Sequence, residues 1–221
     1  YDMMMKELKK IEKDHPEFVT PNSPTQHVGG SAKREAGVLV RHRVPMLSLQ
    51  DVFSKEEVQD FVKSMQETLV DPVFVVEYKI DGLSMALRYE NGLLTTAITR
   101  GDGIIQGEDV TVNAKVIKDV KNKLKEPIEY LEVRGEVYMT NEAFDKVNEI
   151  QELNNKKTFA NPRNCAAGTL RQLDSRITKQ RNLSMFIFNI QDIRGKEITS
   201  HSQGYEYLKI QGMKVIDNYQ V

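Results

Sequence analysis

Hydrophobic and polar residues follow two different periods along this chain of 221 residues, and the period changes at about residue 73. Before that point apolar residues recur every three or four positions, which is typical of amphipathic helices. Residues 1–14 predict the first helix, which stops at His15-Pro16 because helical backbone is disfavoured before a proline. The apolar stripe of this helix comprises Met4, Leu8 and Ile11.

A second helix is predicted over residues 54–69. Ser54 and Glu57 have the spacing of a capping box, which satisfies free N–H groups at a helix start. The stripe expected to be buried comprises Val58, Phe61, Val62, Met65 and Leu69. Between the two helices, residues 20–37 are rich in Pro, Gly, Ser and Thr and have no period, so they predict a linker.

Beyond residue 73 the alternation of polar and apolar residues predicts strands. Residues 73–100 contain two of them, joined at Asn91-Gly92, a favoured type I′ hairpin turn. Residues 130–139 predict another strand, and residues 182–190 predict one apolar enough to be buried on both faces.

Two helices are predicted among these strands. One runs from about Thr140 to Leu153 and is expected to turn Phe144, Val147 and Ile150 inward. The other covers residues 202–211, with Gly212 just past its end, and residues 213–217 begin a last strand. Helices interspersed among explicit hairpins, without a regular strand–helix alternation, predict the α+β class with mostly antiparallel sheet.

Composition and charge narrow the possible functions. The chain is 39% hydrophobic and 29% charged, with a formal net charge of -1. A protein that grips duplex DNA over a wide footprint usually carries a basic excess, so any contact with DNA here is local or shared with other domains. A single cysteine, Cys165, excludes an internal disulfide. No apolar run is long enough to span a membrane, and a cytoplasmic location is expected.

The stretch "EYKIDG" at residues 77–82 carries the candidate chemistry. Alternation along a strand would place Glu77, Lys79 and Asp81 on one face. The opposite face, expected to meet the core, would carry Phe74, Val76, Tyr78 and Ile80. Gly82 would allow the backbone to turn or another group to approach closely.

A second strand repeats this arrangement of charges. One side of residues 130–139 would carry Glu132, Arg134, Glu136 and Tyr138, opposite an apolar side. Two sheets with such charged faces would line a groove. The alternative is that both are edge strands with solvated charges, and the pattern alone favours this alternative.

A nucleophilic lysine must first lose its proton. Lysine has a pKa of about 10.4, so roughly one in a thousand is unprotonated near neutral pH, and offsetting this takes about 4 kcal/mol. Glu77 and Asp81 act in the wrong direction, because nearby anions favour the ammonium form. Nearby cations must lower the pKa instead, either Mg²⁺ on a nucleotide phosphate or arginines. The candidate arginines are Arg100, Arg134, Arg163 and Arg171.

The chain resembles the adenylation domain of bacterial NAD-dependent DNA ligases. The lysine motif K-x-D-G is common to covalent nucleotidyltransferases, and the flanking text makes the match specific. "PMLSLQDVFS", "EYKIDGLSMALRYENG", "AITRGDG", "VRGEVYM" and "FANPRNCAAGTLRQLD" occur in the order and spacing of that family. The resemblance implies a nucleotidyltransferase fold of antiparallel sheets flanked by helices, preceded by the tail of a small helical subdomain.

The resemblance also assigns roles to residues. Lys79 would become adenylylated, while Asp81 belongs to the same motif without a clear role. Glu77 and the backbone near Ser48 and Leu49 would contact the adenine. The remaining assignments are Arg100 and Glu136 for AMP (Glu136 on the ribose), Tyr1 and Asp2 for the nicotinamide mononucleotide (NMN), and Arg163 and Arg171 near phosphates or nicked DNA.

By this resemblance, residues 1–36 form the end of the NMN-binding subdomain with its linker, and residues 37–221 form an adenylation domain truncated at its C-terminus. Two later lysine motifs of the family are absent, and zinc would belong to a domain outside this chain. The implied cofactors and partners are NAD, Mg²⁺ and, through the full-length enzyme, nicked double-stranded DNA, with a monomer expected. We therefore expect this chain to carry out at most the first reaction step, the adenylylation of Lys79, and to do so with reduced efficiency.

Two other functions remain open from the residues. An ATP-dependent ligase or capping-type transferase would use the same lysine, although the N-terminal segment argues against it. A non-catalytic domain that binds nucleotide or nucleic acid would also fit. The four histidines (His15, His27, His42 and His201) are interpreted as structural or solvated, and Cys165 as non-catalytic. The lysine-rich residues 120–127 predict a solvated face, with contact to DNA as the alternative.

Overall fold

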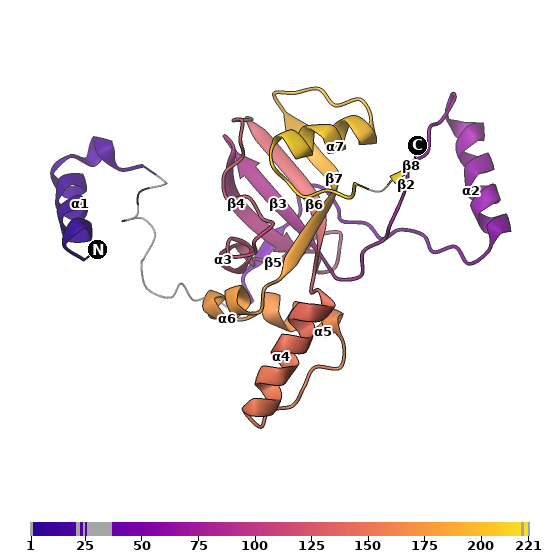
Figure 1. Cartoon of the computed structure of the whole chain (residues 1–221). Helices are drawn as coiled ribbons and strands as arrows, with labels where there is room; N and C mark the ends of the chain where they lie inside the picture. The colour runs from indigo at the N-terminus through magenta and orange to yellow at the C-terminus, as the bar shows by residue number, and fades with distance from the viewer. Residues whose placement is uncertain (1, 21–22, 24, 26–36, 218, 221) are drawn as a thin grey trace.

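The computed structural model describes residues 2–20, 23, 25, 37–217 and 219–220, so most of the predicted linker at residues 20–37 lies outside the described residues. Its centre is a four-stranded antiparallel sheet with the order β4-β3-β6-β7 (Figure 1). These strands are β3 (Leu83–Glu90), β4 (Leu93–Thr99), β6 (Tyr130–Tyr138) and β7 (Ser184–Arg194). The predicted α+β class is confirmed.

The turn between β3 and β4 is the one that the sequence predicts. Asn91 and Gly92 both have positive φ, 50° and 78°, as a type I′ turn requires. The register pairs Glu90 with Leu93 across this turn. Gly92 adopts such a φ without strain, so the tight connection fixes which residues of the two strands face each other.

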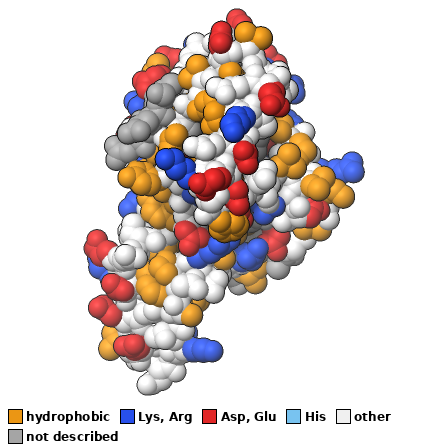
Figure 2. Space-filling view, turned by 90° about the vertical axis from the view of Figure 1, so that its right-hand side faces the viewer, with side chains coloured by type: hydrophobic (Ala, Val, Ile, Leu, Met, Phe, Trp, Pro, Cys, Tyr) orange, Lys and Arg blue, Asp and Glu red, His pale blue; other side chains and the backbone are white. Residues whose placement is uncertain are grey.

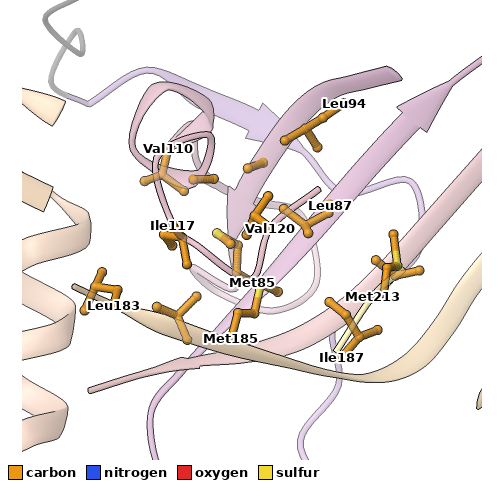
Figure 3. Close-up of a cluster of buried hydrophobic side chains, with 14 of the residues drawn as sticks. Met85, Leu87, Leu94, Val110, Ile117, Val120, Leu183, Met185, Ile187 and Met213 are labelled. Carbon is orange, nitrogen blue, oxygen red and sulfur yellow. The ribbon is translucent and has the colours of Figure 1, made fainter. Parts of the chain in front are cut away.

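One face of the sheet is covered by the chain between β5 (Gln106–Glu108) and β6, which includes the short helix α3 (Thr111–Ala114). Figure 3 shows Met85 and Leu87 of β3 meeting Val110, Ile117 and Val120 from this segment. Met185 and Ile187 of β7 extend the same cluster. This core contains no exposed member, and burial of its side chains supplies the main driving force for folding of the sheet.

Helices surround the two ends of the sheet (Figure 1). α7 (His201–Ile210) packs beside β7, while α4 (Asn141–Leu153), α5 (Pro162–Leu170) and α6 (Ser175–Gln180) lie at the opposite end. Two small antiparallel ladders complete the fold: β1 (Leu39–Arg41) pairs with β5, and β2 (Val76–Glu77) pairs with β8 (Tyr219–Gln220).

The two helices near the N-terminus begin and end close to the predicted residues, but the second is not buried as predicted. α1 (Asp2–Asp14) is followed by a short 3-10 turn, η1 (Pro16–Phe18), and Met4 on its stripe is 75% exposed. α2 (Lys55–Thr68) has its predicted cap, with the Ser54 hydroxyl accepting from Glu57 N–H at 3.1 Å. The predicted burial of its stripe is wrong, since no residue of α2 is buried.

α2 stands away from the central sheet (Figure 1). Val58, Phe61 and Leu69 are 46%, 50% and 53% exposed, so its apolar stripe faces outward. In the space-filling view from this side, hydrophobic side chains lie at the surface among acidic and basic ones (Figure 2).

Three further predictions need correction. Ile150 of α4 is 57% exposed, because α4 projects beyond the sheet and its last turns have little to pack against. β7 is not buried on both faces along its length: Ser184, Met185 and Ile187 are buried, whereas residues 188–193 are only partly buried and Arg194 is exposed. Residues 213–217 form no strand and make a single parallel bridge, between Ile187 and Val215. In the part of the chain that the structure describes, no helix has the length and apolar content needed to cross a membrane.

Candidate active site around Lys79

Lys79 lies on an extended connection between β2 and β3 rather than on a strand. The connection ends at Gly82, whose backbone presses onto β6. A Cβ at this position would come within 2.1 Å of the Val137 carbonyl oxygen and 3.1 Å of Glu136 Cγ. The predicted close approach at Gly82 is therefore confirmed, and it joins the exposed Lys79 segment to the rigid sheet.

The predicted division of residues 74–81 into a core face and a polar face is wrong. Val76 and Tyr78 are 69% and 70% exposed and do not meet the core. The reason is that β2 comprises only two residues, so strand alternation does not extend to Lys79.

Glu136 of β6 is the acid around which the charged groups gather. Burial raises the pKa of its carboxyl group, and the positive charges of Lys79, Arg134 and Arg163 oppose this rise. Asp81 adds a smaller contribution that raises the pKa further. Asp81 and Arg163 form an ion pair of 3.2 Å with side chains 78% and 63% exposed, so the pair is weak and easily rearranged. Lys79 is thus placed beside one half-buried carboxylate and two guanidinium groups.

Arg100 and Arg134 attach the segment at residues 46–48 to this face of the sheet. Arg100 donates to the Met46 carbonyl at 3.0 Å and to Ser48 Oγ at 2.6 Å. Arg134 donates to the Leu47 carbonyl at 2.8 Å and to Ser84 Oγ. Burial and the neighbouring Arg100 lower the pKa of Arg134, which shows that the two cations lie close together.

Glu77 lies beyond this pair, at the side of the site that α7 covers. Its Oε2 accepts from the hydroxyl of Tyr205 and lies 3.4 Å from His201 Nε2. The Tyr205 hydroxyl also donates to the Phe188 carbonyl at 3.2 Å, and the guanidinium of Arg134 lies 5.5 Å from the centre of the Phe188 ring. Tyr205 therefore connects an acceptor, Glu77, with the backbone of Phe188, whose aromatic ring lies next to the guanidinium of Arg134. An acceptor, an aromatic ring and a cation are the groups suited to a base attached to phosphates.

The sequence matches two models of known protein families. Residues 37–221 match the family model described as NAD-dependent DNA ligase adenylation domain, and residues 1–29 match the DNA ligase-like, N-terminal NAD+-binding domain. The chain belongs to the NAD-dependent DNA ligase family. It is similar to proteins named DNA ligase from Clostridium kluyveri (52% identity over 221 residues), Caldicellulosiruptor saccharolyticus (52% over 223) and Acetivibrio thermocellus (49% over 222). Each alignment covers 100% of this chain but only 32–33% of the relative, so the chain spans about a third of their length.

Not every residue that the ligase resemblance assigns lies at this site. Arg171 follows α5 and donates to Glu108 of β5 at 2.8 Å, while Arg163 is in the first turn of the same helix. The two lie eight residue steps apart along the helix, a rise of about 12 Å. Leu49 is 75% exposed. Tyr1 lies outside the described residues, and Asp2 begins α1 with a side chain that is not described.

Glu132 does not belong to the ligase site either, although it shares a face of β6 with Arg134 and Glu136. Its carboxylate is fully buried and accepts from Arg88 at 2.9 Å and from the Tyr130 hydroxyl at 2.5 Å. β6 is a central strand of the sheet, so the alternative of a solvated edge strand is wrong for residues 130–139. The segment that carries Lys79 lies outside this sheet, and Lys79 and Asp81 are exposed, as that alternative expects.

A cavity of about 430 Å³ adjoins Asp81. Its lining residues are Asp81, Met139, Asn141, Asn161, Pro162 and Arg163. The N-termini of α4 and α5, capped by Thr140 and Asn161, begin at this cavity. Arg163 contributes a positive charge to this lining and Asp81 a negative one.

The carboxylates near Lys79 do not form a complete metal site. Among the described residues, no three His, Cys, Asp or Glu side chains are grouped so that they could hold a metal ion. Mg²⁺ is commonly bound by one or two carboxylates together with substrate phosphates. Asp81 and Glu136 fit that mode, in which the nucleotide would supply the remaining ligands.

Three residues of the site were not singled out as functional from the sequence: Phe188, His201 and Tyr205. His201 was interpreted as structural or solvated, but it contacts Glu77, 124 residues away in the chain. No local motif marks such contacts, since each depends on how α7 packs on β7. The one available signal was the polar tips of His201 and Tyr205 on an otherwise core-facing helix.

Proposed function

We propose that this chain performs the adenylation step of an NAD-dependent DNA ligase. The Lys79 nitrogen attacks the adenylyl phosphorus of NAD⁺ and forms a P–N bond. The bond from that phosphorus to the bridging oxygen breaks, NMN leaves, and the amine loses its protons to solvent or a nearby base. The observation that carries the proposal is that Lys79 lies three residues before Gly82, whose backbone packs against β6 next to Glu136. The positive charges of Lys79, Arg134 and Arg163 all act on the Glu136 carboxyl group and oppose the rise in its pKa that burial causes.

The other residues bind and orient the nucleotide. Glu77 and the backbone near Ser48 and Leu49 would contact the adenine, and Glu136 would accept from the ribose. Arg100 would contact AMP, and its bond to Ser48 keeps it next to the base-binding segment. Holding the phosphorus in line with Lys79 supplies a large part of the rate enhancement.

Removal of the lysine proton depends on the surrounding cations. Burial and the positive charge of Arg100 lower the pKa of Arg134, and the charge of Arg163 on α5 acts on Glu136. Positive charges favour the neutral amine and also stabilise the negative charge that develops on the phosphate. Asp81 forms an exposed ion pair with Arg163, so we propose that it helps to orient that arginine.

Further elements of the proposal concern the larger enzyme. Residues 1–36, with Tyr1 and Asp2, would belong to the NMN-binding subdomain, and residues 37–221 to the adenylation domain. The AMP would pass to the 5′-phosphate at a nick in double-stranded DNA, and the 3′-hydroxyl would displace it, with Mg²⁺ assisting. Arg163 and Arg171 would contact phosphates or nicked DNA. We propose a cytoplasmic monomer.

Mass spectrometry after incubation with NAD⁺ and Mg²⁺ tests the first step. We expect a mass increase of one AMP in the original chain and none in Lys79→Ala. Lys146→Ala is the matched control, because Lys146 is an exposed lysine paired with Glu142 on α4. An adduct that persists in Lys79→Ala would contradict the assignment.

The same experiment separates the rival functions. An adduct formed from ATP and not from NAD⁺ would indicate an ATP-dependent ligase or a capping-type transferase. AMP that binds reversibly without a covalent product would indicate a non-catalytic binding domain. The match of residues 1–29 to an NAD+-binding domain favours NAD⁺.

A further inference from the structure

Tyr205 links the hydrophobic core to Glu77, the carboxylate proposed to contact the adenine. The residue is 1% exposed, within the hydrophobic core, yet its hydroxyl reaches Glu77, 128 residues away in the chain. The Glu77 side chain is 25% exposed, so it faces the site while Tyr205 supports it from behind. The buried Tyr205 side chain thus holds the Glu77 carboxylate through a hydrogen bond on the side facing the core.

The two oxygens of the Glu77 carboxylate have different surroundings. Oε2 accepts from the Tyr205 hydroxyl and lies 3.4 Å from His201 Nε2. No hydrogen bond from the described residues ends on Oε1. The His201 and Tyr205 rings lie 4.5 Å apart between centroids, so both donors approach the same oxygen from one helix. Oε2 therefore has its partners on α7, while Oε1 has none among the described residues.

An ionised carboxylate only accepts hydrogen bonds. In an adenine nucleotide the exocyclic 6-amino group is the N–H donor of the base. A 6-oxopurine presents an acceptor at the same position, which would repel a carboxylate oxygen. A fixed acceptor oxygen therefore distinguishes these bases, whereas a freely rotating carboxylate distinguishes them less well.

We propose that Tyr205 is a positioning residue for base selection: its hydroxyl holds Glu77 Oε2 so that Oε1 meets the 6-amino group of adenine. The inference rests on the proposed function, because that function places adenine against Glu77. It goes further by assigning the selection of 6-aminopurine over 6-oxopurine nucleotides to a residue on α7.

A purely structural role for Tyr205 predicts a different result. Its hydroxyl also donates to the Phe188 carbonyl, so its loss would disturb the packing of α7 on β7. Such a disturbance would weaken binding of every purine nucleotide equally. Loss of the proposed positioning would weaken only the binding of nucleotides that carry the 6-amino group.

Calorimetric titration of the chain with AMP and with inosine monophosphate (IMP) separates these roles. In Tyr205→Phe we expect the Kd for AMP to rise about tenfold, the effect expected when a charge-assisted hydrogen bond is lost, with the Kd for IMP unchanged. Tyr207→Phe is the matched control, because Tyr207 is a buried tyrosine of the same helix whose hydroxyl accepts from Gln211. We expect it to leave the ratio of the two Kd values unchanged.

A double-mutant cycle shows whether Tyr205 acts through Glu77. Glu77→Ala should abolish the preference for AMP, and adding Tyr205→Phe to it should produce no further change. If Tyr205→Phe does not fold, Glu77→Asp provides the same test, since it retains the charge but draws the carboxylate back from Tyr205. It should lose the preference as well, and a retained preference would overturn the inference.

The outcomes distinguish the inference from the function on which it rests. If the original chain binds no AMP, the proposed function fails, and the inference fails with it. If the original chain binds AMP and Tyr205→Phe leaves the ratio of the two Kd values unchanged, the inference alone is overturned. An equal weakening of AMP and IMP binding is one such result.

Discussion

The central sheet and the arm formed by residues 47–78, which includes α2 and is called the α2 arm below, have equally clear hydrophobic patterns and different outcomes. In the sheet the apolar residues of β3, such as Met85 and Leu87, are completely or almost completely buried. In the α2 arm, Phe53, Val70 and Val73 are 88%, 95% and 76% exposed. Periodicity reports that a segment has two faces, whereas burial depends on what packs against one of them.

The largest expected difference in stability is between breaking a buried charged pair in the sheet and breaking an exposed charged pair at the site. Glu132→Ala leaves Arg88, 6% exposed, buried without its partner, so we expect a loss of about 3–5 kcal/mol in the free energy of unfolding. Asp81→Ala breaks an exposed pair at the site and should cost less than about 1 kcal/mol, while impairing formation of the AMP adduct. Urea unfolding of both variants measures the difference, and similar losses would contradict it.

Apolar truncations should show the same contrast with a smaller effect. Leu87→Ala opens a cavity in the core of the sheet and should cost about 2–5 kcal/mol. Phe61→Ala in the α2 arm removes a half-exposed ring that contacts Phe74 and should cost less than about 1 kcal/mol. Thermal and urea unfolding provide the measurement. A large cost for Phe61→Ala would show that the α2 arm is covered in solution.

The smallest expected effect concerns pH. Burial raises the pKa of Glu136 in the folded state, so its stabilising contribution is complete below the unfolded pKa and is lost as pH rises through the folded value. Glu136→Gln removes this loss. We therefore expect the variant to gain stability relative to the original chain as pH rises above about 4.3, the unfolded pKa of glutamate, by less than about 1 kcal/mol.

Urea unfolding at several pH values provides this measurement. Glu67→Gln is the control, since Glu67 is an exposed residue of α2 and its substitution should leave the pH dependence unchanged. An identical pH dependence in Glu136→Gln and the original chain would show that burial of Glu136 has no effect on stability.

Local signals in the sequence predicted the local structure well. The turn at Asn91-Gly92, the cap at Ser54 and the close approach at Gly82 are all confirmed, because each depends on a few neighbouring residues. The strand at residues 130–139 is confirmed with its charged and apolar sides.

The parts that were missed depend on contacts across the fold. The sequence could not show that β2 ends before Lys79, since the same alternation continues through Tyr78 and Ile80. The support of Glu77 by Tyr205 depends on the packing of a helix that follows more than a hundred residues later. The site assignments to Lys79, Asp81 and the other residues stay predictions until nucleotide binding is measured.

The glycine at position 82 has one more consequence, for how far the reactive amine can travel. Three residues of extended chain span at most about 10 Å, so the Lys79 backbone lies within about that distance of Gly82. Gly82 in turn packs against the Val137 carbonyl of β6. The region that the Lys79 amine can reach is therefore limited by the attachment of Gly82 to β6. The position of Lys79 therefore depends on the packing of Gly82 against the central sheet as well as on the α2 arm.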